Sequence, residues 1–189
     1  MFRSALARAC IRGLVNLLKV RILGNLVIQD KKMIENVLKN MAHMTYGIYV
    51  LTTRYTDTLN GMIASWVSQV SYDPPLIMVA VHPNRFSHDL LEKSGLFALH
   101  ILARHQTDLI AQFKGPDAAS KFASIAWYEG VTGCPILADC IGSLECRIRQ
   151  TLAPGNHTLF IGEAVNAVFN GETTPLCTVD YEGCYLGKK

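Results

Sequence analysis

The segment Asn60–Pro75, NGMIASWVSQVSYDPP, decides how the middle of this sequence folds. It opens with Asn-Gly, the strongest short signal for a two-residue hairpin turn. Apolar and β-branched residues dominate 62–70 and predict a strand behind that turn. Pro74 and Pro75 have no backbone N–H to donate, so they end the strand. We therefore expect a hairpin that turns at Asn60-Gly61, followed by a strand over 62–70.

This predicted strand is unusually rich in hydroxyl and amide side chains. Ser65, Ser68, Gln69 and Ser71 follow one another within seven residues, and Trp66 lies among them. Polar residues on a strand are commonly only solvated, and a tryptophan there is commonly part of the core. The alternative is that they line a site for a ligand with polar edges and a flat apolar body. The strand alone leaves both interpretations open.

The remaining pattern predicts mainly β structure. Helices are expected over 31–42, from an N-cap at Ser87 to about Gly95, over 104–115 and over 116–126. Further strands are expected over 45–54, 76–82, 96–102, 142–152, 157–169 and 176–187, with 76–82 buried on both faces. Helices do not alternate strictly with strands. We therefore expect a mostly antiparallel barrel with helical insertions rather than a doubly wound sheet.

The composition describes a globular chain. Of its 189 residues, 50% are hydrophobic, and the mean hydropathy is +0.20. No apolar run reaches the roughly 18 residues that a membrane-spanning helix needs, so we expect no membrane span. Residues 30–189 hold 13 basic and 15 acidic side chains, which gives no footprint for nucleic acid.

Residues 1–29 differ from the rest of the chain. They hold five basic side chains and no acidic one, with leucines at helical spacing. This pattern fits an organellar transit peptide or a surface-lying amphipathic helix. It also fits an ordinary basic helix or a start assigned too far upstream. We treat 1–30 as a basic N-terminal extension, disordered or helical, and 31–189 as the functional domain.

The cysteines do not have the spacing of a metal site. Zinc sites use tight pairs of ligands, and no Cys-x-x-Cys pair is present, so we expect reduced, buried cysteines and no metal. With no secretory signal, a cytoplasmic location is the default expectation. The six cysteines are Cys10, Cys134, Cys140, Cys146, Cys177 and Cys184.

Several common catalytic motifs are missing from the sequence. It contains no G-x-G-x-x-G, no P-loop, no G-x-S-x-G and no H-E-x-x-H. What remains is the serine-rich strand and the segment 82–88, HPNRFSH, which follows the next strand. Hydroxyl groups, backbone N–H groups and Arg85 suit a phosphate. A phosphate site beside an apolar slot is what flavin mononucleotide (FMN) requires, although an ordinary β-barrel explains the same residues.

As a set, these segments carry a family resemblance. The stretches GIYVLTT, NGMIASWVSQVSYDPP, HPNRFSHDLLEKSGLFALHIL and GNHTLFIGEAVNA resemble the flavin-reductase-like family of FMN-binding split barrels, over roughly residues 33–185. The resemblance implies a six-stranded antiparallel split β-barrel (Greek key) with flanking helices. It also implies a homodimer with FMN near the subunit interface.

The resemblance also implies which residues hold FMN. A first segment, in the serine-rich strand, would hold the isoalloxazine and ribityl groups, largely through its main chain. A second segment, within 82–88, would contact the phosphate. His157 would lie close to the reacting face of the flavin, although Asn156 precedes it where the family has an Asp. The first segment is Ala64, Ser65, Trp66, Val67, Ser68, Gln69 and Ser71, and the second is Asn84, Arg85, Ser87 and His88.

The implied activity is an NAD(P)H-dependent flavin reductase. A hydride from NADH or NADPH would pass to FMN, and electrons would then go to flavin, ferric iron or a redox protein, with His157 positioning a group or supplying a proton. One alternative is an FMN electron carrier that is reduced by another redox protein and has no productive nicotinamide site. A weaker third alternative is a split barrel that binds pyridoxal phosphate or haem.

Overall fold

The structure is a computed structural model that describes residues 31–115, 117, 118 and 120–180. The chain divides into two compact units, whose described residues lie within 31–44 and 45–180. No helix in the described part is long and apolar enough to cross a membrane. The N-terminal extension expected over 1–30 lies outside the described residues, so it stays a prediction.

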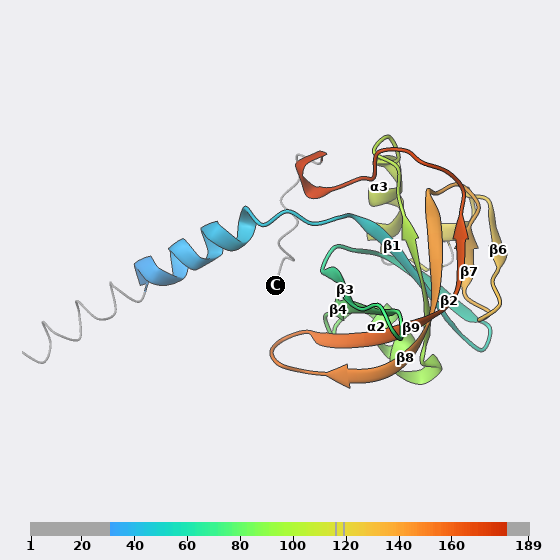
Figure 1. The fold of residues 1–189 in the computed structure, drawn as a ribbon, viewed down its shortest axis with the longest axis horizontal. Helices are drawn as coiled ribbons and strands as arrows, with labels where there is room; N and C mark the ends of the chain where they lie inside the picture. Colours follow the sequence, from blue (N-terminus) through green and yellow to red (C-terminus); the bar gives the residue numbers. More distant parts are fainter. Residues whose placement is uncertain (1–30, 116, 119, 181–189) are drawn as a thin grey trace, which may run out of the picture. The chain divides into compact units, whose positions relative to one another are not determined.

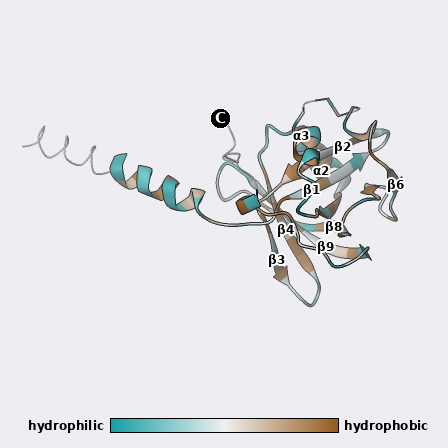
Figure 2. Ribbon diagram, turned by 90° about the horizontal axis from the view of Figure 1, so that it is seen from above, coloured by the Kyte–Doolittle hydropathy of each residue, from teal (hydrophilic) through white to brown (hydrophobic). Residues whose placement is uncertain are grey.

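Residues 31–42 form a helix, as the sequence predicted. Ile34, Val37, Leu38 and Met41 share one side of it because they recur at three- and four-residue spacing. These four side chains are between 43% and 52% exposed. Figure 2 shows hydrophilic and hydrophobic bands alternating along this helix. The helix is therefore amphipathic, and its apolar side is about half exposed.

Residues 45–180 are built on one seven-stranded sheet (Figure 1), in which every neighbouring pair is antiparallel. The strand order is β2-β1-β5-β8-β9-β4-β3. A separate two-stranded sheet pairs β6 with β7. The strands are β1 Tyr49–Tyr55, β2 Thr58–Ala64, β3 Val67–Ser71, β4 Leu76–Val81, β5 Leu96–Ile101, β6 Trp127–Glu129, β7 Pro135–Leu137, β8 Gly142–Leu152 and β9 Thr158–Phe169.

The two end strands of this sheet, β2 and β3, are consecutive in the chain. Only Ser65 and Trp66 separate them, and the backbone N–H of Ala80 in β4 still donates to the carbonyl of Trp66 at 3.0 Å. The chain thus passes from one edge of the sheet directly to the other. This continuity gives the sheet a barrel-like form, as expected for a mainly β fold.

The main sheet has seven strands where the family resemblance implied six. The predicted strand over 62–70 is divided at Ser65 and Trp66 into parts of β2 and β3. Two further predictions about strands were wrong. β4 is not buried on both faces, since half-buried and buried residues alternate along it. The described part of 176–187 forms one isolated bridge, between Cys177 and Gly47, and a short 3₁₀ turn, Thr178–Asp180, instead of a strand.

The hairpin turn also lies elsewhere. Tyr55 pairs with Thr58, so the turn is at Thr56 and Asp57, and Thr56 adopts a positive φ of 52°. Asn60 and Gly61 lie inside β2. A side chain at position 61 would collide with the ring of Phe113. Gly61 is therefore required by a close approach between β2 and an aromatic ring, and the Asn-Gly pair does not make the turn that it resembles.

Two α-helices accompany the barrel. α2, Phe86–Ser94, follows β4 and ends at Gly95, which adopts the left-handed conformation (φ 67°) that glycine tolerates best. Its N-cap is Arg85 and not Ser87 as predicted. α3, Asp108–Lys114, confirms the helix expected over 104–115. The helix expected over 116–126 is reduced, among the described residues, to a 3₁₀ turn, Ser120–Phe122.

The core lies inside the barrel and holds its strands in register. Phe97 and Phe160 are fully buried there with Leu51, Val79 and Leu91. Five of the expected strands, over 45–54, 76–82, 96–102, 142–152 and 157–169, correspond to β1, β4, β5, β8 and β9. The hydrophobic pattern thus located the strands that frame the site described next.

Candidate functional site

Three rings meet at one end of the barrel. The ring centroids of Trp66 and His157 are 4.6 Å apart, and those of His82 and His157 are 5.1 Å apart in an edge-to-face arrangement. Trp66 is 38% exposed, so the cluster is open to solvent on one side. An exposed indole beside two imidazoles is a surface on which a flat ring can stack.

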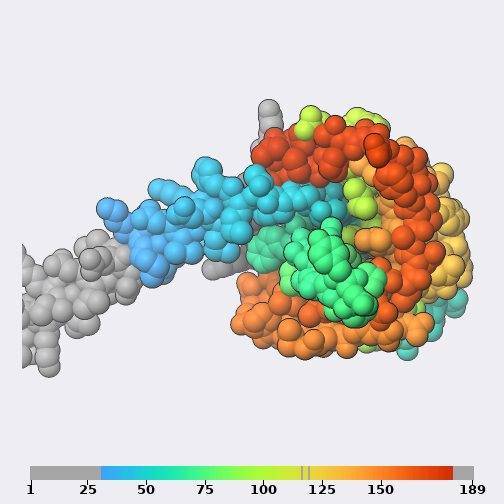
Figure 3. Space-filling view, in the orientation of Figure 1, coloured from blue at the N-terminus to red at the C-terminus, as the bar shows by residue number. Residues whose placement is uncertain are grey.

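Strand register brings these rings together. Val81, the last residue of β4, pairs with Thr158, the first residue of β9. His82 and His157 adjoin this pair, one just beyond each strand end. Figure 3 shows the segment of β3 and β4, in green, beside the β8–β9 hairpin, in orange. Trp66 joins from the break between β2 and β3.

His157 has a defined hydrogen-bond partner. Its Nδ1 lies 2.8 Å from Oδ1 of Asn156. An amide oxygen only accepts, so Nδ1 carries the proton, and neutral His157 presents an unprotonated Nε2. Burial lowers the pKa of His157, and the nearby His82 and Arg85 lower it further. His157 is therefore a neutral ring whose free nitrogen accepts hydrogen bonds.

Arg85 lies at the start of α2, close to this cluster. Asn84 and Arg85 are exposed, and the backbone N–H of Asn84 donates to Nδ1 of His82 at 3.2 Å. No side chain caps the N-terminus of α2. The first amides of a helix without a side-chain cap, together with a guanidinium, form a donor set that suits an anion.

Two predicted phosphate residues have their side chains turned inward. Ser87 is 1% exposed, and its Oγ accepts a hydrogen bond from Nδ2 of Asn60 at 2.9 Å. Nε2 of His88 lies 2.8 Å from Oγ1 of Thr158, and its ring packs edge-on against Phe160. Any contact of these two residues with a bound anion must come from their main chain unless the side chains move.

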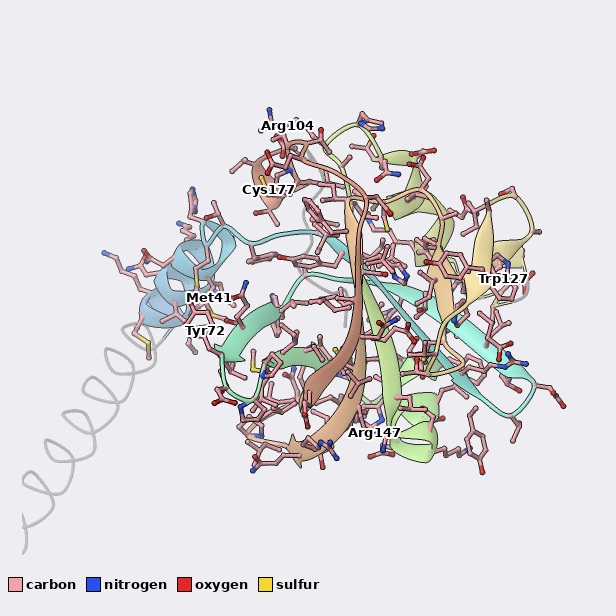
Figure 4. The ribbon with its side chains drawn as sticks, turned by 45° about the vertical axis from the view of Figure 1, so that its right-hand side comes forward. Met41, Tyr72, Arg104, Trp127, Arg147 and Cys177 are labelled. Atoms are coloured by element: carbon pink, nitrogen blue, oxygen red, sulfur yellow. The ribbon has the colours of Figure 1, made fainter. Side chains whose placement is uncertain are left out.

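The predicted isoalloxazine and ribityl residues divide into two groups. Ala64 and Ser65 are buried at the end of β2, next to Trp66 and the half-buried Val67. The second group, Ser68, Gln69 and Ser71, runs along β3 away from the rings. Ser71 pairs with Leu76, five residues before Val81, so it lies roughly 16 Å along the strand from the ring cluster. Tyr72, labelled in Figure 4, follows Ser71 and is 92% exposed.

Other residues of the site were missed by the sequence reasoning. Asn60 was assigned to a turn, but it is buried against Ser87 and Lys121. Lys121 was placed in a short helix over 116–126, where nothing in the local pattern marks it as buried. Asn156 was noted only as the loss of a charged partner for His157, yet it supplies a neutral one.

The donor set and the open ring cluster fit a phosphate-bearing flavin. A family model, the flavin reductase like domain, matches residues 41–186. The chain belongs to this family. The resemblance seen in the sequence is thereby confirmed.

Known proteins of this kind come from several bacteria. A high molecular weight rubredoxin of Moorella thermoacetica is 33% identical over 76% of this chain and 64% of its own length. A Streptomyces globisporus NADH:FAD oxidoreductase is 26% identical, with a TM-score of 0.68 over 79% of this chain and 83% of its own. An FMN-binding protein of Thermus thermophilus is 28% identical, with a TM-score of 0.61 over 67% and 72%.

The curated relatives are longer than this chain. The chain spans 64% of the length of the Moorella rubredoxin and 25% of the length of a Synechocystis diflavin flavoprotein. The similarity to them therefore concerns the flavin reductase like domain and not their whole sequences.

Proposed function

We propose that this protein binds FMN and uses it as an oxidoreductase that accepts a hydride from NADH or NADPH. The observation that carries this proposal is the meeting of Trp66, His157 and Arg85 at one end of the barrel. An exposed aromatic surface beside a cation and a helix N-terminus without a side-chain cap matches the two parts of a flavin mononucleotide, its ring and its phosphate.

In this proposal, Arg85, Asn84 and the first amides of α2, including that of Ser87, hold the phosphate. The backbone N–H of His88 already donates to the carbonyl of Arg85 at 2.8 Å, so His88 contributes only if this turn opens. The chain around the β2–β3 break, Ala64 to Val67, lies along the isoalloxazine, and Trp66 contacts its face. Ser68 and Gln69 follow the break and provide polar contacts for the ribityl chain. Ser71, roughly 16 Å from the ring cluster, is left to a second substrate. Bound FMN supplies the two-electron acceptor, and the protein orients the reactants and excludes water.

His157 is proposed as a positioning residue for this reaction. With its proton on Nδ1 and hydrogen-bonded to Asn156, it presents an acceptor at Nε2. An acceptor suits the amide N–H₂ of a nicotinamide or the N–H edge of a flavin. Because burial, His82 and Arg85 lower its pKa, His157 is poorly suited to store a proton for delivery.

The relatives support flavin chemistry, but they do not distinguish FMN from FAD or identify the electron acceptor. One relative is an FMN-binding protein and another is an NADH:FAD oxidoreductase. We favour FMN because the site offers one anion-binding cluster. A homodimer with FMN near the subunit interface remains part of the proposal.

A second function is favoured by the Moorella relative, whose name is high molecular weight rubredoxin. In this alternative, FMN stays bound and exchanges electrons with a redox protein, and no productive nicotinamide site exists. The two functions differ in the reductant and not in the flavin site.

Anaerobic stopped-flow measurements on the FMN-loaded protein separate these functions. The reductase predicts bleaching of the flavin band by NADH or NADPH within seconds. No bleaching by either nucleotide, but bleaching by reduced rubredoxin or ferredoxin, would favour the carrier. A colourless protein that takes up neither FMN nor FAD in an absorbance titration would overturn both.

A further inference from the structure

Lys121 is a buried cation that no part of the proposed function has used. It lies in the 3₁₀ turn Ser120–Phe122 and is only 5% exposed. Its Nζ donates to Oδ1 of Asn60 at 3.0 Å and to the carbonyl of Gly61 at 2.9 Å. Both acceptors are uncharged. Removing an ammonium group from water is costly, and the nearby Asp117 offsets only part of that cost, because the pKa of Lys121 remains lowered.

The contacts of Lys121 lead directly to the first turn of α2. Because Oδ1 of Asn60 accepts from Lys121, the amide is oriented with its N–H₂ toward Ser87, whose Oγ it meets at 2.9 Å. Asn60 and Ser87 are both buried. The hydrogen bonds thus run in one direction, from Lys121 through Asn60 to Ser87, and join β2 to the start of α2.

The charge of Lys121 also acts on this region. Burial lowers the pKa of Lys121, Asp117 raises it, and Arg85 lowers it. The contribution of Arg85 means that the two cations are near enough to repel each other. An anion beside Arg85 would relieve this repulsion, and the poorly solvated surroundings of Lys121 would strengthen its attraction for that anion.

We propose that Lys121 is a positioning residue for the phosphate of the bound flavin, acting through Asn60 and Ser87 on the first turn of α2 and through its charge. This proposal rests on the proposed flavin function. Ser87 is too buried to reach a ligand from its present position, so the three residues act by holding the amides of α2 and Arg85 in place. A role of this kind concerns the phosphate and not the isoalloxazine ring.

Comparison of FMN with riboflavin, which has the same ring and no phosphate, tests the proposal. We expect Lys121→Met to raise the Kd for FMN at least tenfold in calorimetric titrations, whereas the Kd for riboflavin changes less than threefold. Met keeps most of the length of the lysine side chain and removes its charge. Lys93→Met, which removes an exposed lysine from the last turn of α2, is the matched control and should leave both constants within twofold.

A second variant guards against a loss of folding in Lys121→Met. Asn60→Asp keeps the size of the side chain and the acceptor for Lys121, neutralises that charge and removes the donor to Ser87. It should also weaken FMN at least tenfold and spare riboflavin, with a urea midpoint close to that of the wild type.

Two results would overturn the proposal while leaving the proposed function intact. In the first, the wild type binds FMN and the variants weaken FMN and riboflavin equally, which indicates a purely structural lysine. In the second, the folded variants bind both ligands as the wild type does. A wild type that binds no flavin would instead overturn the proposed function itself, and the proposal with it.

Discussion

Nδ1 of His157 and Oδ1 of Asn156 are 2.8 Å apart, in a hydrogen bond between neighbours that fixes the proton on the ring. Because the acceptor is an uncharged amide, this bond stabilises the imidazolium form much less than a carboxylate would. Burial, His82 and Arg85 all lower the pKa of His157. The surroundings thus favour the neutral ring, and Asn156 fixes which nitrogen carries its proton.

Asn156→Asp should raise the pKa of His157, since a carboxylate stabilises the charged ring. We expect an increase of about one unit, followed through the ring resonances of His157 in a pH titration by NMR. Arg85→Ala should move the same pKa upward by removing a nearby positive charge. An unchanged titration in Asn156→Asp would show that the hydrogen bond does not form in solution.

Arg85→Ala should also weaken the binding of FMN by about 1.5–3 kcal/mol, the usual value of a hydrogen bond to a charged group. The measurement is the Kd from calorimetry. Arg147→Ala is the matched control, because Arg147 is an exposed arginine on β8, labelled in Figure 4. Equal affinities of Arg85→Ala and wild type would remove Arg85 from the site.

Gly61→Ala should lower the free energy of unfolding by about 1–3 kcal/mol, because the added methyl group meets the ring of Phe113. Urea denaturation gives the value. Gly155→Ala is the control, since no atom lies within 4 Å of the position that its added Cβ would take. Combining Gly61→Ala with Phe113→Leu should recover part of the loss, and a double variant as unstable as the sum of the two would argue against the contact.

His100 predicts a dependence of stability on pH. It is fully buried, with Nδ1 donating to the carbonyl of Val50 and Nε2 accepting from the N–H of Leu137, each at 3.1 Å. These partners fix the neutral ring, and burial lowers its pKa to about 4. The folded state therefore cannot take up a proton that the unfolded state binds below about pH 6.5.

The free energy of unfolding should accordingly fall as the pH decreases from about 6.5 to about 4, by up to about 3 kcal/mol from this residue. Urea titrations at several pH values measure it. His100→Gln removes the titrating group, so the difference between wild type and variant should shrink across this window. Parallel pH curves for the two proteins would contradict the prediction.

Elements with a long apolar run or a clear helical period were the ones that the sequence predicted well. β5, β8 and β9 follow from runs of apolar and β-branched residues, and the helix over 31–42 and α3 follow from helical periodicity. The short strands β6 and β7 were missed, because three-residue strands have no measurable period. Turn propensity also misplaced the hairpin turn. The Asn-Gly pair is typical of turns, but here Asn60 is a buried amide and Gly61 lies against the ring of Phe113.

The site was predictable only where its residues lie at the ends of strands that pair with each other. His82, Arg85 and His157 lie at strand ends that the hydrophobic pattern had already located, so their approach follows from antiparallel pairing. The contact of Lys121 with Asn60 joins residues 61 positions apart in the sequence through a 3₁₀ turn. No local periodicity encodes such a contact, because it depends on how the whole chain packs.

The chain has two tryptophans, and they lie in different surroundings. Trp66 stacks near His157 at the β2–β3 break, while Trp127, labelled in Figure 4, belongs to β6 and packs against Phe122. The indole emission of this protein therefore has one component beside the proposed flavin and one in the separate two-stranded sheet. With Trp127→Phe, the intrinsic fluorescence becomes a reporter for Trp66 alone, quenched when a flavin stacks on it and when His157 gains a proton.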